Sequence, residues 1–165
     1  LPGVDMNGGD FQSNSSFSFS SPLVSYVVWD FAGVNSNEAI FAGVSTNPPH
    51  ARVSNPDSSG DIKLLLQGPD GDIQSNRKTL TGALALKFES DGSNSSIELN
   101  GNVIATGNPG TASRDGFTFG DLSVLFGDRF QSFSTMYEFA EYQNPTQQVQ
   151  TEAETALSNK WGVTF

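Results

Sequence analysis

The 165-residue sequence carries 18 acidic and 8 basic side chains, a formal net charge of −10 at pH 7, and no cysteine. The absence of cysteine excludes disulfides, thiolate metal sites and cysteine nucleophiles, so packing and strand pairing have to stabilise the fold. The acidic balance and the lack of a basic cluster argue against nucleic acid as a partner. No apolar run reaches the roughly 18 residues that a membrane span needs, so we expect no membrane insertion.

The length is that of one domain, and we predict a single domain over residues 1–165. The chain starts with Leu1-Pro2-Gly3, without an initiator methionine or a signal peptide. We therefore expect the domain to be the C-terminal module, or a processed fragment, of a longer protein.

Short runs of β-branched, aromatic and leucine residues alternate with clusters of Gly, Ser, Asn, Asp and Thr. This pattern is typical of an antiparallel protein with many strands, so we predict an all-β fold. Asn100-Gly101, between two of the apolar runs, is a strong signal for a two-residue hairpin turn. The predicted strands are residues 16–20, 23–31, 39–46, 51–54, 62–67, 80–89, 96–99, 103–106, 122–126 and 134–142.

Two of the predicted strands carry the clearest burial pattern. Residues 23–31 are almost continuously apolar, which is typical of a strand covered on both faces, and Trp29 is expected to be buried there. Leu84, Leu86 and Phe88 recur at every second position, as in a strand with only one buried face. We expect these strands to carry the core.

The hydrophobic period changes to that of a helix near the C-terminus. Thr146 is suited to cap the helix, Lys160 falls in its last turn, and Gly162 stands where a left-handed residue ends it. An apolar stripe recurs at helical spacing, formed by Val149, Ala153, Ala156, Leu157 and Trp161. The sequence therefore predicts one short C-terminal α-helix that docks on the strands and is held there by Trp161.

The residues that carry a family resemblance lie mainly in the C-terminal third. Residues 136–144, Met-Tyr-Glu-Phe-Ala-Glu-Tyr-Gln-Asn, together with the helix and Trp161-Gly162, resemble the closing strand and helix of the concanavalin A-like lectin/glucanase superfamily in its LamG-like form. Residues 97–101, 4–11 and 122–127 are similar to a hairpin, the opening strand and a late strand of that form. The resemblance implies a two-sheet antiparallel jelly-roll β-sandwich with one concave sheet, in a family found in phage structural proteins and secreted bacterial proteins.

Catalytic groups are scarce. Glycoside hydrolases need two carboxylates on one face, whereas Glu138 and Glu141 are three residues apart and point to opposite faces of a regular strand. We therefore expect Glu138 to have a structural role, such as accepting hydrogen bonds. His50 is the only histidine and follows two prolines, so we predict a surface or turn position for it rather than a catalytic one. The sequence predicts that the chain is not an enzyme.

Aromatic and polar side chains gather between residues 114 and 133. Glycan sites combine an aromatic platform with groups that hydrogen-bond hydroxyls, and this segment is rich in both kinds. Packing of its phenylalanines in the core is the alternative explanation of the cluster. The candidate ligand-binding residues are Arg114, Asp115, Phe117, Asp128, Arg129 and Gln131.

Calcium is the one metal that loops of this composition could bind, because it prefers clustered oxygen ligands. The candidate ligands are Asp57, Asp61, Asp70 and Asp72. The same residue types also form tight turns, so both explanations stay open. One histidine and no cysteine do not make an ordinary zinc site, and no phosphate-binding loop is present, so we expect no other cofactor.

These features leave two functional hypotheses, since a third, a glycoside hydrolase or lyase, lacks its pair of carboxylates. The first is a virion structural or attachment module of a phage fibre, spike or capsid, which contacts other virion or surface-protein subunits as a homo-oligomer or array and touches host glycans. The second is a carbohydrate-binding, lectin-like module of a secreted or surface bacterial protein. Both place the chain on a virion or outside the cell.

Overall fold

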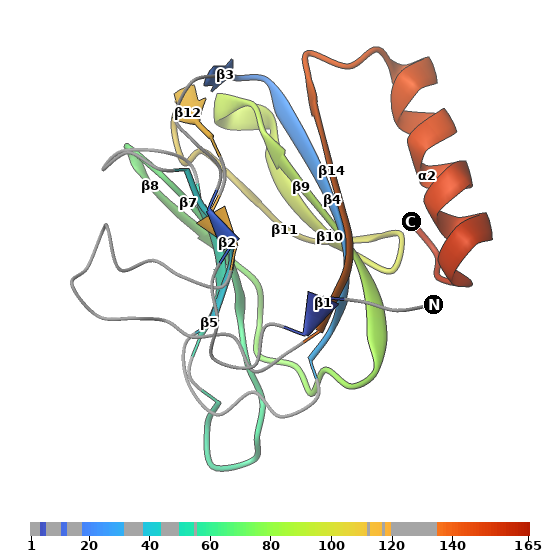
Figure 1. Ribbon diagram of the computed structural model, residues 1–165. Coiled ribbons are helices and arrows are strands. Elements are labelled where there is room, and N and C mark those ends of the chain that lie inside the picture. Colours follow the sequence, from blue (N-terminus) through green and yellow to red (C-terminus); the bar gives the residue numbers. More distant parts are fainter. Residues whose placement is uncertain are drawn as a thin grey trace.

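Two antiparallel sheets face each other, and a C-terminal helix lies against the outer side of the larger sheet (Figure 1). The structure, a computed structural model, describes residues 4–5, 11–12, 18–31, 38–43, 50–54, 56–111, 113–116, 118–119 and 135–165. The predicted all-β jelly-roll β-sandwich with one short C-terminal helix is confirmed. The predicted strand at residues 122–126 lies outside the described residues.

The larger sheet has six strands in the order β1-β14-β4-β9-β10-β11. Every pair of neighbours is antiparallel, and the long strands β4 and β14 pair along almost their whole length. The strands are β1 (Val4–Asp5), β4 (Leu23–Asp30), β9 (Ala83–Ser90), β10 (Ser95–Leu99), β11 (Asn102–Gly107) and β14 (Thr135–Gln143), with a 3-10 turn η1 (Gly92–Asn94) before β10.

The smaller sheet has four strands in the order β5-β6-β7-β8, and two short ribbons complete the sandwich. The sheet consists of β5 (Glu38–Phe41), β6 (His50–Val53), β7 (Leu64–Gly68) and β8 (Gly71–Gln74). The ribbons pair β2 (Phe11–Gln12) with β13 (Thr118–Phe119), and β3 (Ser18–Ser20) with β12 (Ser113–Asp115).

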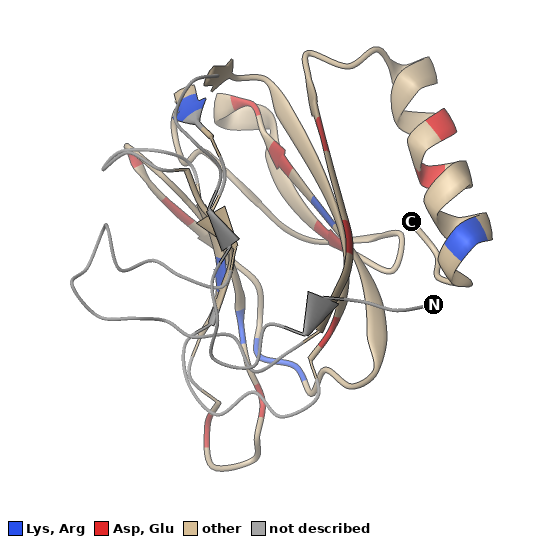
Figure 2. Cartoon of the chain, viewed as in Figure 1, with Lys and Arg blue, Asp and Glu red and all other residues tan. Residues whose placement is uncertain are grey.

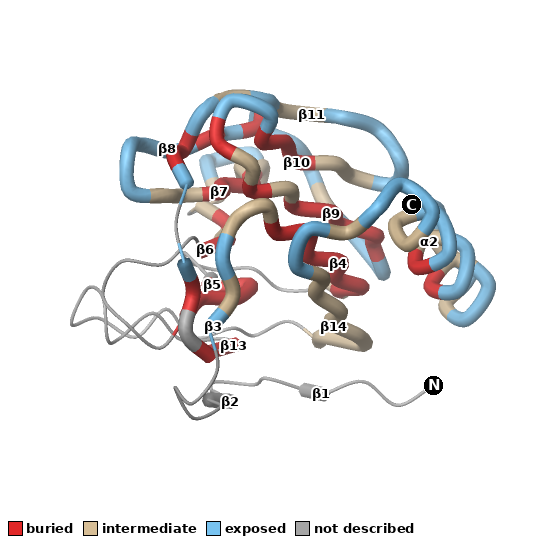
Figure 3. The backbone as a smooth tube through the Cα atoms, turned by 90° about the horizontal axis from the view of Figure 1, so that it is seen from above, coloured by how far each residue is buried: buried red, intermediate tan, exposed pale blue. Residues whose placement is uncertain are grey.

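The core fills the space between the two sheets. Val27, Trp29 and Leu86 of the larger sheet pack in one apolar cluster with Val53 and Leu66 of the smaller sheet. Figure 3 shows the buried positions along β4, β9, β6 and β7. Trp29 is fully buried, as predicted.

The helix α2 (Gln147–Trp161) covers the outer face of the larger sheet. Tyr26 of β4 packs with Ala153 and Leu157 of α2, so β4 is buried on both faces, as its apolar run predicted. The prediction of one buried face for β9 is wrong, because Lys87 on its outer face is only 8 % exposed. Its ammonium lies 3.0 Å from the Glu154 carboxylate of α2, and the attraction between the two charges offsets the cost of burying them.

The helix begins and ends where the sequence predicted. The Thr146 hydroxyl accepts a hydrogen bond from the Val149 amide, and Gly162 adopts a left-handed conformation at the C-terminal end. Ala153 and Leu157 of the predicted apolar stripe are buried, whereas Ala156 is exposed. No helix in the described ranges has the length and hydrophobicity that crossing a membrane requires.

The turn between β10 and β11 confirms a prediction that rested on local turn chemistry. Asn100 and Gly101 both have positive φ, 49° and 73°, as expected of the Asn-Gly hairpin turn that joins β10 and β11.

The strands β8, β12 and β13 were not predicted, because each is short and β8 has a single buried apolar residue, Ile73. His50 is also not at the surface: it lies in β6 and is 4 % exposed.

The core packing predicts that truncation to alanine has very different effects on stability at two aliphatic positions of the larger sheet. Leu86→Ala removes a fully buried side chain and should lower the free energy of unfolding by about 2–5 kcal/mol. Val103→Ala, at a side chain in the same sheet that is 59 % exposed, should change it by less than about 0.5 kcal/mol. Urea unfolding of both variants checks this, and equal losses would contradict the assignment of the core.

Candidate functional site

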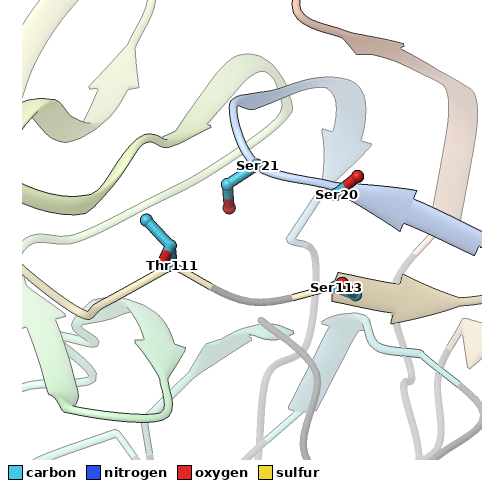
Figure 4. A pocket seen from close by; sticks show the side chains of 4 residues that line it. All are labelled: Ser20, Ser21, Thr111 and Ser113. Atoms are coloured by element: carbon cyan, nitrogen blue, oxygen red, sulfur yellow. The ribbon is translucent and has the colours of Figure 1, made fainter.

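A small hollow lined by hydroxyl groups lies at one end of the sandwich (Figure 4). Its volume is about 190 Å³, and Ser20, Ser21, Thr111 and Ser113 line it. Ser20 and Ser113 flank it on neighbouring strands, with Ser21 and Thr111 on its other side. At ~30 Å³ per water molecule, the space holds about six waters or one small polar ring.

The ribbon of β3 and β12 builds one wall of this hollow. Ser20 lies directly opposite Ser113 in the ribbon, so both side chains are on the same face, and both are exposed. The next pair, Phe19 and Arg114, is on the other face, and Arg114 is buried. Gln143, at the end of β14, donates a 3.0 Å hydrogen bond to the Ser20 hydroxyl and adds an amide to the rim.

The loop that carries Thr111 is fixed to its neighbours. The Asp70 amide donates to the Pro109 carbonyl at 3.0 Å, and the Gly110 amide donates to the Asn108 side chain at 3.1 Å. Gly110 has a φ of +85°, and a Cβ there would collide with the Asp70 carboxylate. The positive φ and the close approach of the Asp70 carboxylate both favour glycine at this position.

A buried ion pair anchors the ribbon to the larger sheet. The Arg114 guanidinium contacts the Glu141 carboxylate of β14, and both side chains are 1 % exposed. The Ser25 hydroxyl of β4 donates to the same carboxylate at 2.5 Å, and the guanidinium lies 4.7 Å from the centre of the Phe41 ring. Burial lowers the pKa of Arg114 to about 9, so the guanidinium still carries its charge at neutral pH.

The sequence predicted a ligand site between residues 114 and 133, which does not include the residues that line the hollow. Arg114 is buried on the face of the ribbon opposite to Ser20 and Ser113, and Asp115 pairs with Ser18 through the backbone. The four lining hydroxyls had no distinguishing signal, because serine and threonine occur throughout the chain. The other candidate residues, Phe117, Asp128, Arg129 and Gln131, lie outside the described residues.

The predicted calcium ligands lie in two turns. Asp57 accepts hydrogen bonds from the Asp61 and Ser59 amides at 3.0 and 2.9 Å, and these bonds lower the pKa of its carboxyl group. Asp70 and Asp72 belong to the β7–β8 hairpin. Within the described ranges, no group of three or more His, Asp and Glu side chains is arranged to hold a metal ion. Calcium binding stays a prediction.

The two carboxylates of β14 point to opposite faces, as predicted. Glu141 is turned into the sandwich against Arg114. Glu138 is on the helix side, where Lys160 and the Trp161 indole donate hydrogen bonds to it at 2.6 and 2.5 Å. Neither faces the other across a cleft, and the expected structural role of Glu138 is confirmed.

A second hollow lies at the opposite end of β9, between residues 78–81 and the β10–β11 hairpin. Its volume is about 510 Å³. Aliphatic side chains meet polar ones here, and the lining residues are Lys78, Thr79, Leu80, Thr81, Leu84, Leu99 and Asn100. Lys78 is its one charged lining residue among those described.

Comparison with solved structures identifies the fold. The chain is similar to the CBM40 module of a Ruminococcus gnavus sialidase bound to α2,3-sialyllactose, with a TM-score of 0.64, 12 % identity, and coverage of 93 % of this chain and 96 % of the module. The chain has the β-sandwich fold of that carbohydrate-binding module. No family model matches the sequence, and no curated protein matches it significantly.

Two further structures share the sandwich. One is domain 4 of an extracellular GH43 arabinanase from Geobacillus stearothermophilus, bound to arabinotriose, with a TM-score of 0.59, 15 % identity, and coverage of 83 % of this chain and 68 % of that one. The other is an alginate lyase from Alteromonas sp. 272, with a TM-score of 0.50, 13 % identity, and coverage of 86 % and 87 %. These likenesses are consistent with the concanavalin A-like resemblance and establish the fold alone.

The buried ion pair predicts that the stability of the fold depends strongly on both Arg114 and Glu141. Arg114→Met leaves the Glu141 carboxylate buried without a counter-charge, so we expect a loss of about 3–5 kcal/mol in the free energy of unfolding. The double variant Arg114→Met/Glu141→Leu removes both charges and should recover most of that loss. Urea unfolding measures both, and a double variant as unstable as the single one would contradict the pairing.

The Glu138 contacts predict an acid-sensitive helix. Partial burial raises the pKa of Glu138, but the hydrogen bonds from Lys160 and Trp161 outweigh it and hold the pKa below its ordinary value. Because the folded-state pKa is the lower one, these contacts stabilise the docked helix above the unfolded pKa and are lost as the pH falls through the folded value. Tryptophan fluorescence followed from neutral pH to about 3 should show this step in the native chain and not in Glu138→Gln. Identical titrations would contradict the assignment.

Proposed function

We propose that the chain is a glycan-binding module of the lectin type and that the hydroxyl-lined hollow between β3 and β12 holds a sugar. The observation that carries the proposal is this hollow, whose described lining residues are all uncharged, at the end of a sandwich whose fold is that of carbohydrate-binding modules. Two of the similar structures contain bound oligosaccharides, sialyllactose and arabinotriose, which supports a saccharide as the ligand class.

The chemistry of the hollow suits sugar hydroxyls. Each serine or threonine hydroxyl donates one hydrogen bond and accepts others, so it can pair with a sugar hydroxyl in either direction. Ser20 already accepts from the Gln143 amide, which leaves its own hydrogen to donate. The hydrogen bonds of the Asp70 and Gly110 amides constrain the loop that carries Thr111, which lowers the conformational entropy lost on binding.

The described residues support binding rather than catalysis. Those lining residues of the hollow that the structure describes include no acid, base or strong nucleophile, and both β14 carboxylates bind structural partners. A non-enzymatic module is therefore the function that this geometry favours.

The setting of the module is a separate part of the proposal. We infer that it works outside the cell, as the extracellular arabinanase domain does. Display on a virion, as a homo-oligomer or array with other subunits, rests on the composition of the sequence and stays a prediction.

A glycan array followed by calorimetric titration of the strongest binder tests the function. Ser113→Phe fills the hollow and should weaken binding at least ten-fold. Ser113→Ala removes one neutral hydrogen bond, which contributes about 0.5–1.5 kcal/mol, and should weaken binding by a few-fold.

Ser59→Phe is the matched control, because Ser59 is exposed in the turn before β7, whereas the far end of β7 leads to Asp70, which bonds Pro109 beside the hollow. It should bind as the native chain does, and all three variants should keep the native melting temperature within a few degrees. An array without any binding would overturn the proposed function, and equal effects of Ser113→Phe and Ser59→Phe would overturn the assigned site.

A further inference from the structure

The second hollow, between residues 78–81 and the β10–β11 hairpin, has the size of a small-molecule site. Its volume of about 510 Å³ lies within the range of roughly 300–1,000 Å³ that such sites usually have. The hydroxyl-lined hollow is smaller, at about 190 Å³. Figure 2 shows basic residues in the segment between β8 and β9, at the end of the sandwich away from β3 and β12. The second hollow is therefore large enough to hold a ligand of its own.

Both walls of this hollow are fixed by backbone pairing. In one wall, the backbone of Lys78 exchanges two hydrogen bonds with Ile62, at 2.9 and 3.0 Å. In the other wall, the Asn100 amide donates to the Ala85 carbonyl at 2.8 Å, and the Asn100 side-chain oxygen accepts from the Ala85 amide at 2.9 Å. These bonds constrain the walls before a ligand binds, which lowers the conformational entropy lost on binding.

Leucine side chains form the apolar part of the hollow. Leu84 belongs to the buried core and is 9 % exposed, while Leu80 and Leu99 are partly buried and pack against the same core. None of the described lining residues is aromatic, so the hollow has no ring platform for the face of a sugar. Its apolar part is suited to an aliphatic chain.

The polar groups of the rim are mainly hydrogen-bond donors. The Lys78 ammonium forms no hydrogen bond or ion pair with the residues that the structure describes. The Asn100 side chain uses its oxygen for the Ala85 amide, so its NH2 group remains to donate to a ligand. The Thr79 hydroxyl donates to the Asp61 carboxylate, and its oxygen is left as an acceptor. Because the described lining residues include no carboxylate, this rim favours an anionic ligand group.

We infer that the second hollow binds an aliphatic carboxylate, with the hydrocarbon chain against the leucines and the carboxylate at the Lys78 ammonium. The ammonium provides a charge-assisted hydrogen bond, and the Asn100 NH2 group is a further donor on the rim. Transfer of the hydrocarbon chain from water to the leucine surface adds to the affinity. This site is separate from the hydroxyl-lined hollow, so the inference does not rest on the proposed glycan binding.

Calorimetric titration with three matched probes tests the inference. Octanoate has both the chain and the charge, octanamide has the chain without the charge, and acetate has the charge without the chain. The native chain should bind octanoate saturably, at least ten-fold more tightly than it binds octanamide or acetate.

Substitutions at the hollow test its assignment as the site. Lys78→Met removes the charge and keeps an aliphatic side chain, so octanoate should bind at least ten-fold more weakly, at the level of octanamide. Thr81→Trp fills the hollow from an exposed position and should weaken the binding of both octanoate and octanamide. Both variants should keep the native melting temperature within a few degrees.

Lys63→Met is the matched control, because Lys63 donates to Gln74 and is not among the lining residues. Its affinity for octanoate should stay within two-fold of the native value. Three results would each overturn the carboxylate site: no saturable binding of octanoate, equal affinities for octanoate and octanamide, or equal losses in Lys78→Met and Lys63→Met. None of them bears on glycan binding at the other hollow, and a glycan array without any binding would overturn that function alone.

Discussion

The buried contact between Arg114 and Glu141 ties the candidate site to the rest of the fold. It joins the short ribbon of β3 and β12 to β14 and, through the Ser25 hydroxyl, to β4. A ribbon of two three-residue strands makes few contacts of its own, so this charge pair fixes where Ser20 and Ser113 stand. The cost of burying two charges is offset only while both are present.

The helix α2 determines which surfaces remain for binding. It packs against the outer face of the larger sheet through Tyr26, Lys87 and Glu138, away from the end of the sandwich at which the hollow lies. The hollow lies at one end of the sandwich, beside the ribbon of β3 and β12.

Much of the fold follows from periodicity and turn chemistry. The continuous apolar run of β4, the Asn100-Gly101 turn and the capped helix are encoded within a few residues, and each was predictable. Features that depend on distant contacts were not. Lys87 is buried because it pairs with Glu98 of β10 and with Glu154, 67 residues away on the helix, and His50 is buried although prolines precede it.

The candidate site shows the same limit. The sequence singled out Arg114 for its chemistry, but the charge pairs with Glu141 inside the sandwich. Nothing in the sequence distinguishes Ser20 or Ser113 from the other serines, because their role arises from the register of β3 against β12.

Two-dimensional amide NMR spectra of the chain, titrated with neutral and acidic oligosaccharides, test the central claim of glycan binding most directly. The account predicts saturable shifts at Ser20, Ser21, Thr111 and Ser113, the residues that line the hollow. Spectra that do not change with any oligosaccharide, or shifts confined to the second hollow between Lys78 and Asn100, would contradict it.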